Sequence, residues 1–131
     1  MLIMKNNIVK DKSFDFAIRI VKLYQYLCNE KKEFTLSKQL LRSGTSIGAM
    51  IREAEHAESK NDFIHKFAIA QKEANESVYW LELLKATDYL NEKEFENINN
   101  DAIAILKLIT SILKTTKKQI ISKESLLKIN N

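Results

Sequence analysis

The chain has 131 residues, a formal net charge of +4, no proline and two glycines. This length suits one domain with its own core, and the near absence of turn residues excludes an all-β fold, which needs them at every corner. Leu, Ile, Ala, Lys and Glu dominate instead, and these residues favour helices. The lone Cys28 excludes a disulfide framework and a cysteine metal site.

No apolar run approaches the roughly 20 residues of a membrane span, and the first residues do not form a secretory leader. We therefore expect a cytoplasmic protein without a membrane role. The charge is uneven, because residues 88–105 carry −4 and residues 106–131 carry +5. A basic balance of this size permits contact with nucleic acid without requiring it.

The first predicted helix spans about residues 13–30, with Ser13 as its N-cap and residues 1–12 as a flexible arm. It carries two apolar stripes, the first made of Phe14, Ala17, Ile18, Val21, Tyr24 and Cys28. Together the stripes cover more of the helix than a lone bundle would bury. We expect the second stripe to contact another copy of the chain, through Phe16, Ile20, Leu23 and Leu27.

The second predicted helix spans about residues 36–58, with Thr35 as its cap. Its inward stripe comprises Leu36, Leu40, Ile47, Ile51 and Ala54. Gly44 and Gly48 lie one turn apart inside this helix, where each glycine costs about 1 kcal/mol relative to alanine. We interpret them as the place where another helix backbone crosses closely, in preference to a kink.

The third predicted helix spans about residues 60–87 and begins at Ser59, which with Asp62 resembles a capping box. Its core stripe comprises Phe63, Phe67, Ala70, Ala74, Val78, Leu81 and Leu84. A second stripe is again more than a lone bundle needs. We assign that stripe to the oligomer interface, through Ile69, Glu73, Glu76, Trp80 and Leu83.

The fourth predicted helix spans about residues 92–118, capped by Asn91 or Asp88, and has one clean apolar stripe from Phe95 to Ile120. Residues 119–131 are predicted to be a flexible tail or an extension of the helix. Connections of a few residues between long helices favour antiparallel neighbours. The sequence therefore predicts a single all-α domain over residues 1–131, an antiparallel up-down-up-down four-helix bundle.

The centre of the chain resembles a known family. The segments that carry the resemblance are QLLRSGTSIGA (39–49), IREA (51–54), SKNDFIHKFAIAQKEANES (59–77) and YWLELL (79–84). They are similar to the small bacterial four-helix bundle proteins encoded within intervening sequences of 23S ribosomal RNA genes. Met50 departs from that pattern, in which a polar residue is expected.

The resemblance implies a homo-oligomer, with a pentameric ring as the expected state. The chain is also similar to the accessory variability proteins of diversity-generating retroelements, basic pentamers thought to engage nucleic acid and a reverse transcriptase. The intervening-sequence family brings no established activity.

Candidate catalytic and metal-binding residues are few. Glu53 and His56 have the i, i+3 spacing of a di-iron ligand pair, but the chain lacks the second such pair that a di-iron site needs. A charged set comprising Arg42, Arg52, Glu53, Glu73 and Glu76 has no nucleophile or phosphate loop beside it. We expect ion pairs between helices or subunits, no catalytic residues, no metal and no cofactor.

Two basic faces are candidates for phosphate contact. Lys107, Lys114 and Lys118 share one face of the fourth helix, while Arg19, Lys22 and Tyr26 share the polar sector of the first, with Tyr26 as a stacking surface. The sequence therefore favours a non-enzymatic, homo-oligomeric protein that binds RNA or DNA without sequence preference. The alternative is a scaffold that recruits another protein, with no role for nucleic acid.

Overall fold

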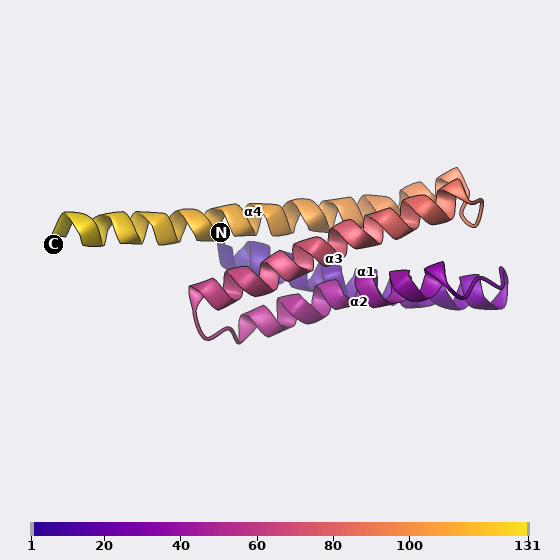
Figure 1. The fold of residues 1–131 in the computed structure, drawn as a ribbon, viewed down its shortest axis with the longest axis horizontal. Coiled ribbons are helices and arrows are strands. Elements are labelled where there is room, and N and C mark those ends of the chain that lie inside the picture. Colours follow the sequence, from indigo (N-terminus) through magenta and orange to yellow (C-terminus); the bar gives the residue numbers. More distant parts are fainter. Residues whose placement is uncertain (1, 131) are drawn as a thin grey trace.

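The computed structural model describes residues 2–130, and the side chains of residues 2–129, as four helices and no strands. They are α1 (Leu2–Asn29), α2 (Leu36–Glu55), α3 (Lys60–Ala86) and α4 (Glu92–Asn130). Figure 1 shows each helix running back along the one before it, and α1 also contacts α4. The predicted all-α, up-down-up-down bundle is confirmed.

The predicted stripes of α2, α3 and α4 form the core. Leu40, Ile47, Phe67, Leu81 and Ile109 are all at most 1% exposed. Each of these helices therefore presents the face that its hydrophobic periodicity predicts, because burying that face removes the most apolar surface from water.

The predicted flexible arm is wrong, because α1 begins at Leu2 and Val9 is fully buried. Ser13 is an internal helix residue whose hydroxyl donates to the carbonyl of Lys10 at 3.0 Å, and it does not cap the helix. Met1 lies outside the described residues.

The two stripes of α1 also exchange roles. Phe16, Ile20 and Leu27 are at most 1% exposed and belong to the core, so the prediction that they contact another copy is wrong. Once the helix starts at Leu2, core positions recur every seven residues, in the series Leu2, Val9, Phe16, Leu23 and the series Ser13, Ile20, Leu27. This heptad spacing keeps one seam against the neighbouring helices. The other stripe, with Phe14, Ile18 and Val21, faces outward.

The two glycines mark the crossing of α1 and α2, as predicted. A Cβ atom built on Gly44 would lie 2.8 Å from Cγ1 of Ile20, and one on Gly48 would lie 3.3 Å from Oγ of Ser13. Only a residue without a side chain lets Ile20 approach α2 this closely.

The caps of α3 and α4 follow the sequence signals. Ser59 accepts a hydrogen bond from the backbone of Asp62 at 3.0 Å, and Asn91 and Glu94 form a reciprocal capping box. The expected cap of α2 is wrong, because the Thr35 side chain makes no capping bond and the carboxylate of Glu33 caps the helix. In addition, α2 ends at Glu55 and not near residue 58.

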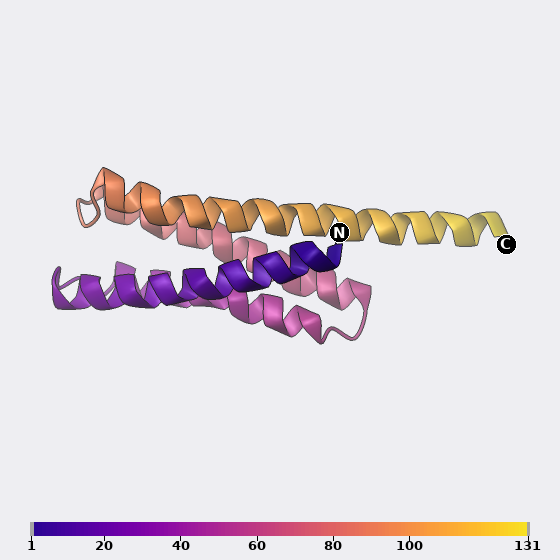
Figure 2. The ribbon, with the colours of Figure 1, turned by 180° about the vertical axis from the view of Figure 1, so that it is seen from behind.

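The last part of α4 projects beyond the bundle as a single helix (Figure 2). Of the two expectations for residues 119–131, the helix extension is therefore correct up to Asn130 and the flexible tail is wrong. Ile121, Leu126 and Leu127 are all more than half exposed on it. Asn131 lies outside the described residues. Within the described part of the chain, no helix has both the length and the apolar character that crossing a bilayer requires.

Candidate functional site

The three lysines predicted on the fourth helix line one surface groove of about 540 Å³. Three hydroxyl side chains line it with them, from Thr110, Ser111 and Thr115. Lys107, Lys114 and Lys118 are exposed, and no carboxylate within the described residues forms a salt bridge with them. The groove therefore presents ammonium groups and the hydroxyls of Ser111 and Thr115, which suit phosphate oxygens, whereas the Thr110 hydroxyl already donates to the carbonyl of Leu106.

One further cation approaches this face from a different helix. Lys5 of α1 donates to the hydroxyl of Ser111 at 2.9 Å. The sequence analysis does not include Lys5 among the basic residues, because it assigns residues 1–12 to a flexible arm. Its place beside α4 follows from the early start of α1.

The three residues predicted on the first helix line one groove, but Arg19 already has charged and polar partners there. The guanidinium of Arg19 is ion-paired with Asp101 and also donates to Asn97, both on α4. Arg19 therefore joins α1 to α4 and is not a free phosphate ligand. The groove that Arg19 lines with Lys22 and Tyr26 is separate from the lysine face of α4.

That second groove lies between α1 and the start of α4 and has a volume of about 500 Å³. In Figure 2 the N-terminal end of α1 lies near α4, and the two helices diverge towards the C-terminal end of α1, where the residues that line the groove are found. Its apolar lining comes from Leu23, Leu90 and Ile98, with the ring of Tyr26 beside them. The charged lining comes from four residues, Arg19, Lys22, Lys93 and Glu94.

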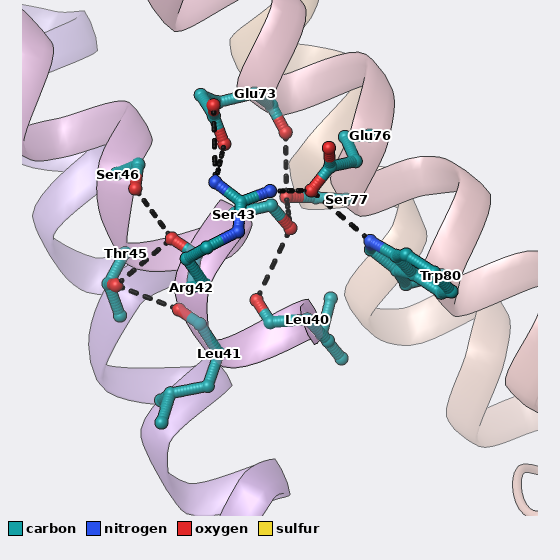
Figure 3. A network of polar contacts seen from close by, with 10 residues as sticks. All are labelled: Leu40, Leu41, Arg42, Ser43, Thr45, Ser46, Glu73, Glu76, Ser77 and Trp80. Atoms are coloured by element: carbon teal, nitrogen blue, oxygen red, sulfur yellow. Dashed lines mark hydrogen bonds and ion pairs between the residues drawn. The ribbon is translucent and has the colours of Figure 1, made fainter. Parts of the chain in front are cut away.

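The charged set of the central motif forms a network between α2 and α3 (Figure 3). Arg42 pairs with Glu73 at 3.1 Å and also with Glu76, which accepts a hydrogen bond from the indole of Trp80 at 3.2 Å. Below it, the buried hydroxyls of Ser43 and Ser77 are 3.0 Å apart. The expected ion pairs between helices are confirmed within one chain.

The network also bears on the predicted oligomer interface. Glu73, Glu76 and Trp80 satisfy one another and Arg42 within the chain, so none of them needs a second copy for a partner. Leu23, Ile69 and Leu83 are half-buried. The most exposed large apolar side chains near the middle of α1 are instead Phe14 and Ile18, at 50% and 41%.

Glu53 and His56, whose spacing resembles a metal-ligand pair although no metal site is expected, are not brought together with other ligands. Glu53 pairs with Lys66 at 3.3 Å, and His56 is exposed at the end of α2. Within residues 2–130, no group of three or more His, Cys, Asp or Glu side chains could hold a metal ion.

The fold and the central motif can now be compared with known proteins. The model of the 23S rRNA-intervening sequence protein family matches residues 5–111, which is most of the chain. This chain belongs to that family.

One solved structure similar to this chain is a protein of unknown function from the S23 ribosomal protein family of Bacteroides thetaiotaomicron. The two sequences are 63% identical, the TM-score is 0.83, and the match covers 84% of this chain and 98% of the other. None of the curated proteins matches this chain.

The two grooves lie differently with respect to the family match. The groove between α1 and α4 and the Arg42 network fall entirely inside residues 5–111. The lysine face crosses its end, since Lys107 lies inside the match and Lys114 and Lys118 lie beyond it. In this member of the 23S rRNA-intervening sequence protein family, Lys114 and Lys118 therefore lie outside the matched residues.

Proposed function

We propose that this chain is a non-enzymatic, homo-oligomeric bundle protein that binds RNA or DNA without sequence preference, through the lysine face of α4. The observation that carries the proposal is the groove in which Lys107, Lys114 and Lys118 stand beside three hydroxyl side chains. The bundle contains none of the modules that read base edges, so contacts would go to the phosphate backbone.

The spacing of the lysines suits a charged polymer. With a rise of about 1.5 Å per residue, Lys107 and Lys118 are roughly 16 Å apart along the helix axis. That span corresponds to a few consecutive phosphates of one strand, and the three ammonium groups are free of competing carboxylates in the described residues. Because the sequence pI is about 9.1, the chain is positively charged at neutral pH and attracts a polyanion.

Assembly of several copies would strengthen the positive electrostatic field around the protein. A ring of copies, each with a net charge of +4, attracts a polyanion more strongly and from farther away than one copy. The exposed stripe of Phe14, Ile18 and Val21 supports an interface between copies, because a monomer gains nothing from presenting three neighbouring apolar side chains to water. Pentameric assembly is part of this proposal.

The test is a salt titration of binding to a labelled RNA strand and to a DNA duplex. If each chain neutralises three phosphates through the lysine face, log K should fall with log salt with a slope of about −2.7 per chain on duplex DNA and about −2.1 on single strands. The combined variant Lys107→Gln, Lys114→Gln and Lys118→Gln should remove most of that slope.

A matched control removes the same charge elsewhere. Lys31, Lys38 and Lys72 are exposed and lie outside both grooves, and their combined change to glutamine should leave most of the affinity intact. Equal losses in the two triple variants would show that net charge matters and the lysine face does not. No binding by the parent protein at about 50 mM salt would overturn the proposal.

A protein-recruiting scaffold is the second candidate. The observation that favours it is the projecting end of α4, where Ile121, Leu126, Leu127 and Ile129 are each at least 56% exposed. An exposed apolar surface of this kind is typical of protein contacts. Assembly without nucleic-acid binding in the same titration would favour the scaffold.

A further inference from the structure

We propose that the groove between α1 and α4 receives one unpaired nucleotide of a bound single strand, with its base against Tyr26 and its phosphate beside Lys22 and Lys93. The inference rests on the proposed function and adds that the protein prefers single strands to duplexes. It concerns a different surface from the lysine face of α4.

The groove has the composition of a site for a flat ring with an anionic group. Leu90 and Ile98, which line its apolar side, are 3% and 5% exposed, so they belong to the rigid core. Tyr26 packs against the same core, and its ring lines the groove. A nucleobase placed there would cover apolar surface and stack on an aromatic side chain, a contact that tolerates any base.

The charged lining selects an anion. Lys22 and Lys93 come from opposite helices, are exposed, and form no salt bridge within the described residues. The one carboxylate in the lining, that of Glu94, already accepts a hydrogen bond from the backbone of Asn91 at 2.9 Å as part of the α4 cap. The guanidinium of Arg19 also lines the groove but is paired with Asp101, so Lys22 and Lys93 supply the unpaired positive charge and outnumber the single carboxylate of Glu94.

The position of the groove is held by polar contacts between the two helices. Arg19 donates to Oδ1 of Asn97, which turns the amide nitrogen of Asn97 away from the guanidinium. That nitrogen can donate to a base carbonyl or a phosphate oxygen, since Asn97 also lines the groove.

Size separates the two kinds of nucleic acid. A volume of about 500 Å³ lies within the range of about 300–1,000 Å³ that small-ligand sites occupy. It can take one nucleotide, whereas a duplex keeps its bases stacked and out of reach. Only an unpaired base can reach Tyr26.

The experiment compares binding of a fluorescein-labelled ten-residue oligouridylate with binding of a mixed-sequence DNA duplex, for the parent protein and three variants. Tyr26→Ala should weaken oligouridylate binding roughly 5- to 100-fold, whereas Tyr26→Phe, which keeps the ring, should stay within about twofold. Duplex affinity should change less than about twofold in both variants.

The third variant, Lys22→Gln with Lys93→Gln, should reduce the salt slope on oligouridylate by about 1.4. Its control, Lys31→Gln with Lys38→Gln, makes the same charge change outside the groove. Since Lys22 and Lys93 are exposed, this pair remains decisive if circular dichroism shows that Tyr26→Ala loses helicity.

The outcomes separate this inference from the proposed function. If the parent protein binds neither probe, the proposed function is wrong. If it binds oligouridylate and neither Tyr26→Ala nor the Lys22 and Lys93 pair differs from its control, the groove holds no nucleotide and the proposed function stands. If Tyr26→Phe loses as much affinity for oligouridylate as Tyr26→Ala does, stacking on the ring is excluded. If Tyr26→Ala loses as much affinity for the DNA duplex as for oligouridylate, selection of single strands is excluded.

Discussion

Glu33 carries out the role at the start of α2 that the sequence pattern assigns to Thr35. Its carboxylate accepts hydrogen bonds from the backbone nitrogens of Thr35, Leu36 and Ser37, the shortest at 2.7 Å, and its side chain is largely buried. Burial alone would raise the pKa of Glu33. The backbone donors and the Ser37 hydroxyl outweigh burial and hold that pKa below its ordinary value.

This lowered pKa gives a prediction for stability against pH. Because the folded pKa is depressed, the contribution of Glu33 is fully present above the ordinary carboxyl pKa of about 4.3 and is lost as the pH falls through the folded pKa. Glu33→Gln should lower the free energy of unfolding by about 1–2 kcal/mol at pH 7. The difference from the parent should shrink towards pH 3, as measured by urea denaturation.

The matched control is Glu30→Gln, which removes an exposed carboxylate from the same connection. It should change stability little at either pH. A Glu33→Gln deficit that is the same at pH 3 and pH 7 would show that the charge of Glu33 does not contribute to the cap.

At the scale of the helices, the two glycines of α2 are not equivalent. At Gly44 the side chain in the way is Ile20, which is fully buried and branched at Cβ, so it has little freedom to move. At Gly48 the nearest atom is the hydroxyl of Ser13, and it lies farther away. The tightest contact is therefore that of the Ile20 side chain with Gly44, whereas at Gly48 the backbone of Ser13 also lies close.

The two alanine substitutions should accordingly have different effects. In each, alanine gains about 1 kcal/mol of helix propensity over glycine. Gly44→Ala must also displace Ile20, an overpacking cost of about 1–3 kcal/mol, and should be destabilised or at best neutral. Gly48→Ala should be as stable as the parent or more stable in urea denaturation. If Gly44→Ala is instead the more stable of the two variants, the crossing is centred on Gly48.

At the scale of the whole molecule, assembly depends on which apolar surface remains outside the bundle. Phe14 is half exposed with the guanidinium of Arg52 over its ring at 5.0 Å, and Ile18 and Val21 continue the stripe along α1. This stripe is adjacent to α2, so a second copy would cover both helices. The proposed interface therefore lies on the α1–α2 side of the bundle.

Disrupting that stripe should dissociate the oligomer without unfolding the chain. Ile18→Glu with Val21→Glu places two charges where another copy would dock, and we expect sedimentation velocity to show monomers with unchanged helicity by circular dichroism. The control pair, Ile121→Glu with Leu127→Glu, changes apolar and more exposed positions on the projecting end of α4 and should leave the oligomer intact. A parent protein that stays monomeric at its highest attainable concentration would contradict the proposal.

The errors in predicting α1 have a common physical origin. With the helix started at Ser13, its two stripes are about equally apolar, and periodicity alone cannot decide which one faces inward. The helix continues to Leu2 in the structure, where Leu2 and Val9 extend the Phe16 series at heptad spacing and pack in the core. In the same way, Lys5 would have joined the basic face if the first twelve residues had been read as helical.

The candidate sites differ in how well the sequence predicts them, depending on whether their residues lie on one helix or on two. Lys107, Lys114 and Lys118 could be placed together from sequence because all three belong to one helix, whose geometry sets their spacing. Lys93 could not be joined to Lys22 and Tyr26, because the two sets are far apart in the chain and meet only where α1 and α4 diverge. The ion pair of Arg19 with Asp101 could not be predicted for the same reason, since Asp101 is on the opposite helix.

The sequence by itself determined that the chain is helical, where three of its helices begin, which faces of α2, α3 and α4 are buried, and that α2 is crossed closely at its glycines. These features depend on helix propensity and on hydrophobic periodicity along one helix, and both are set by residues that are close together in the sequence. Only the tertiary structure decided which stripe of α1 is buried, which charges neutralise one another, and where a groove opens between helices. Those outcomes depend on contacts between residues distant in sequence, and two equally apolar faces are distinguished only by the helices that pack against them.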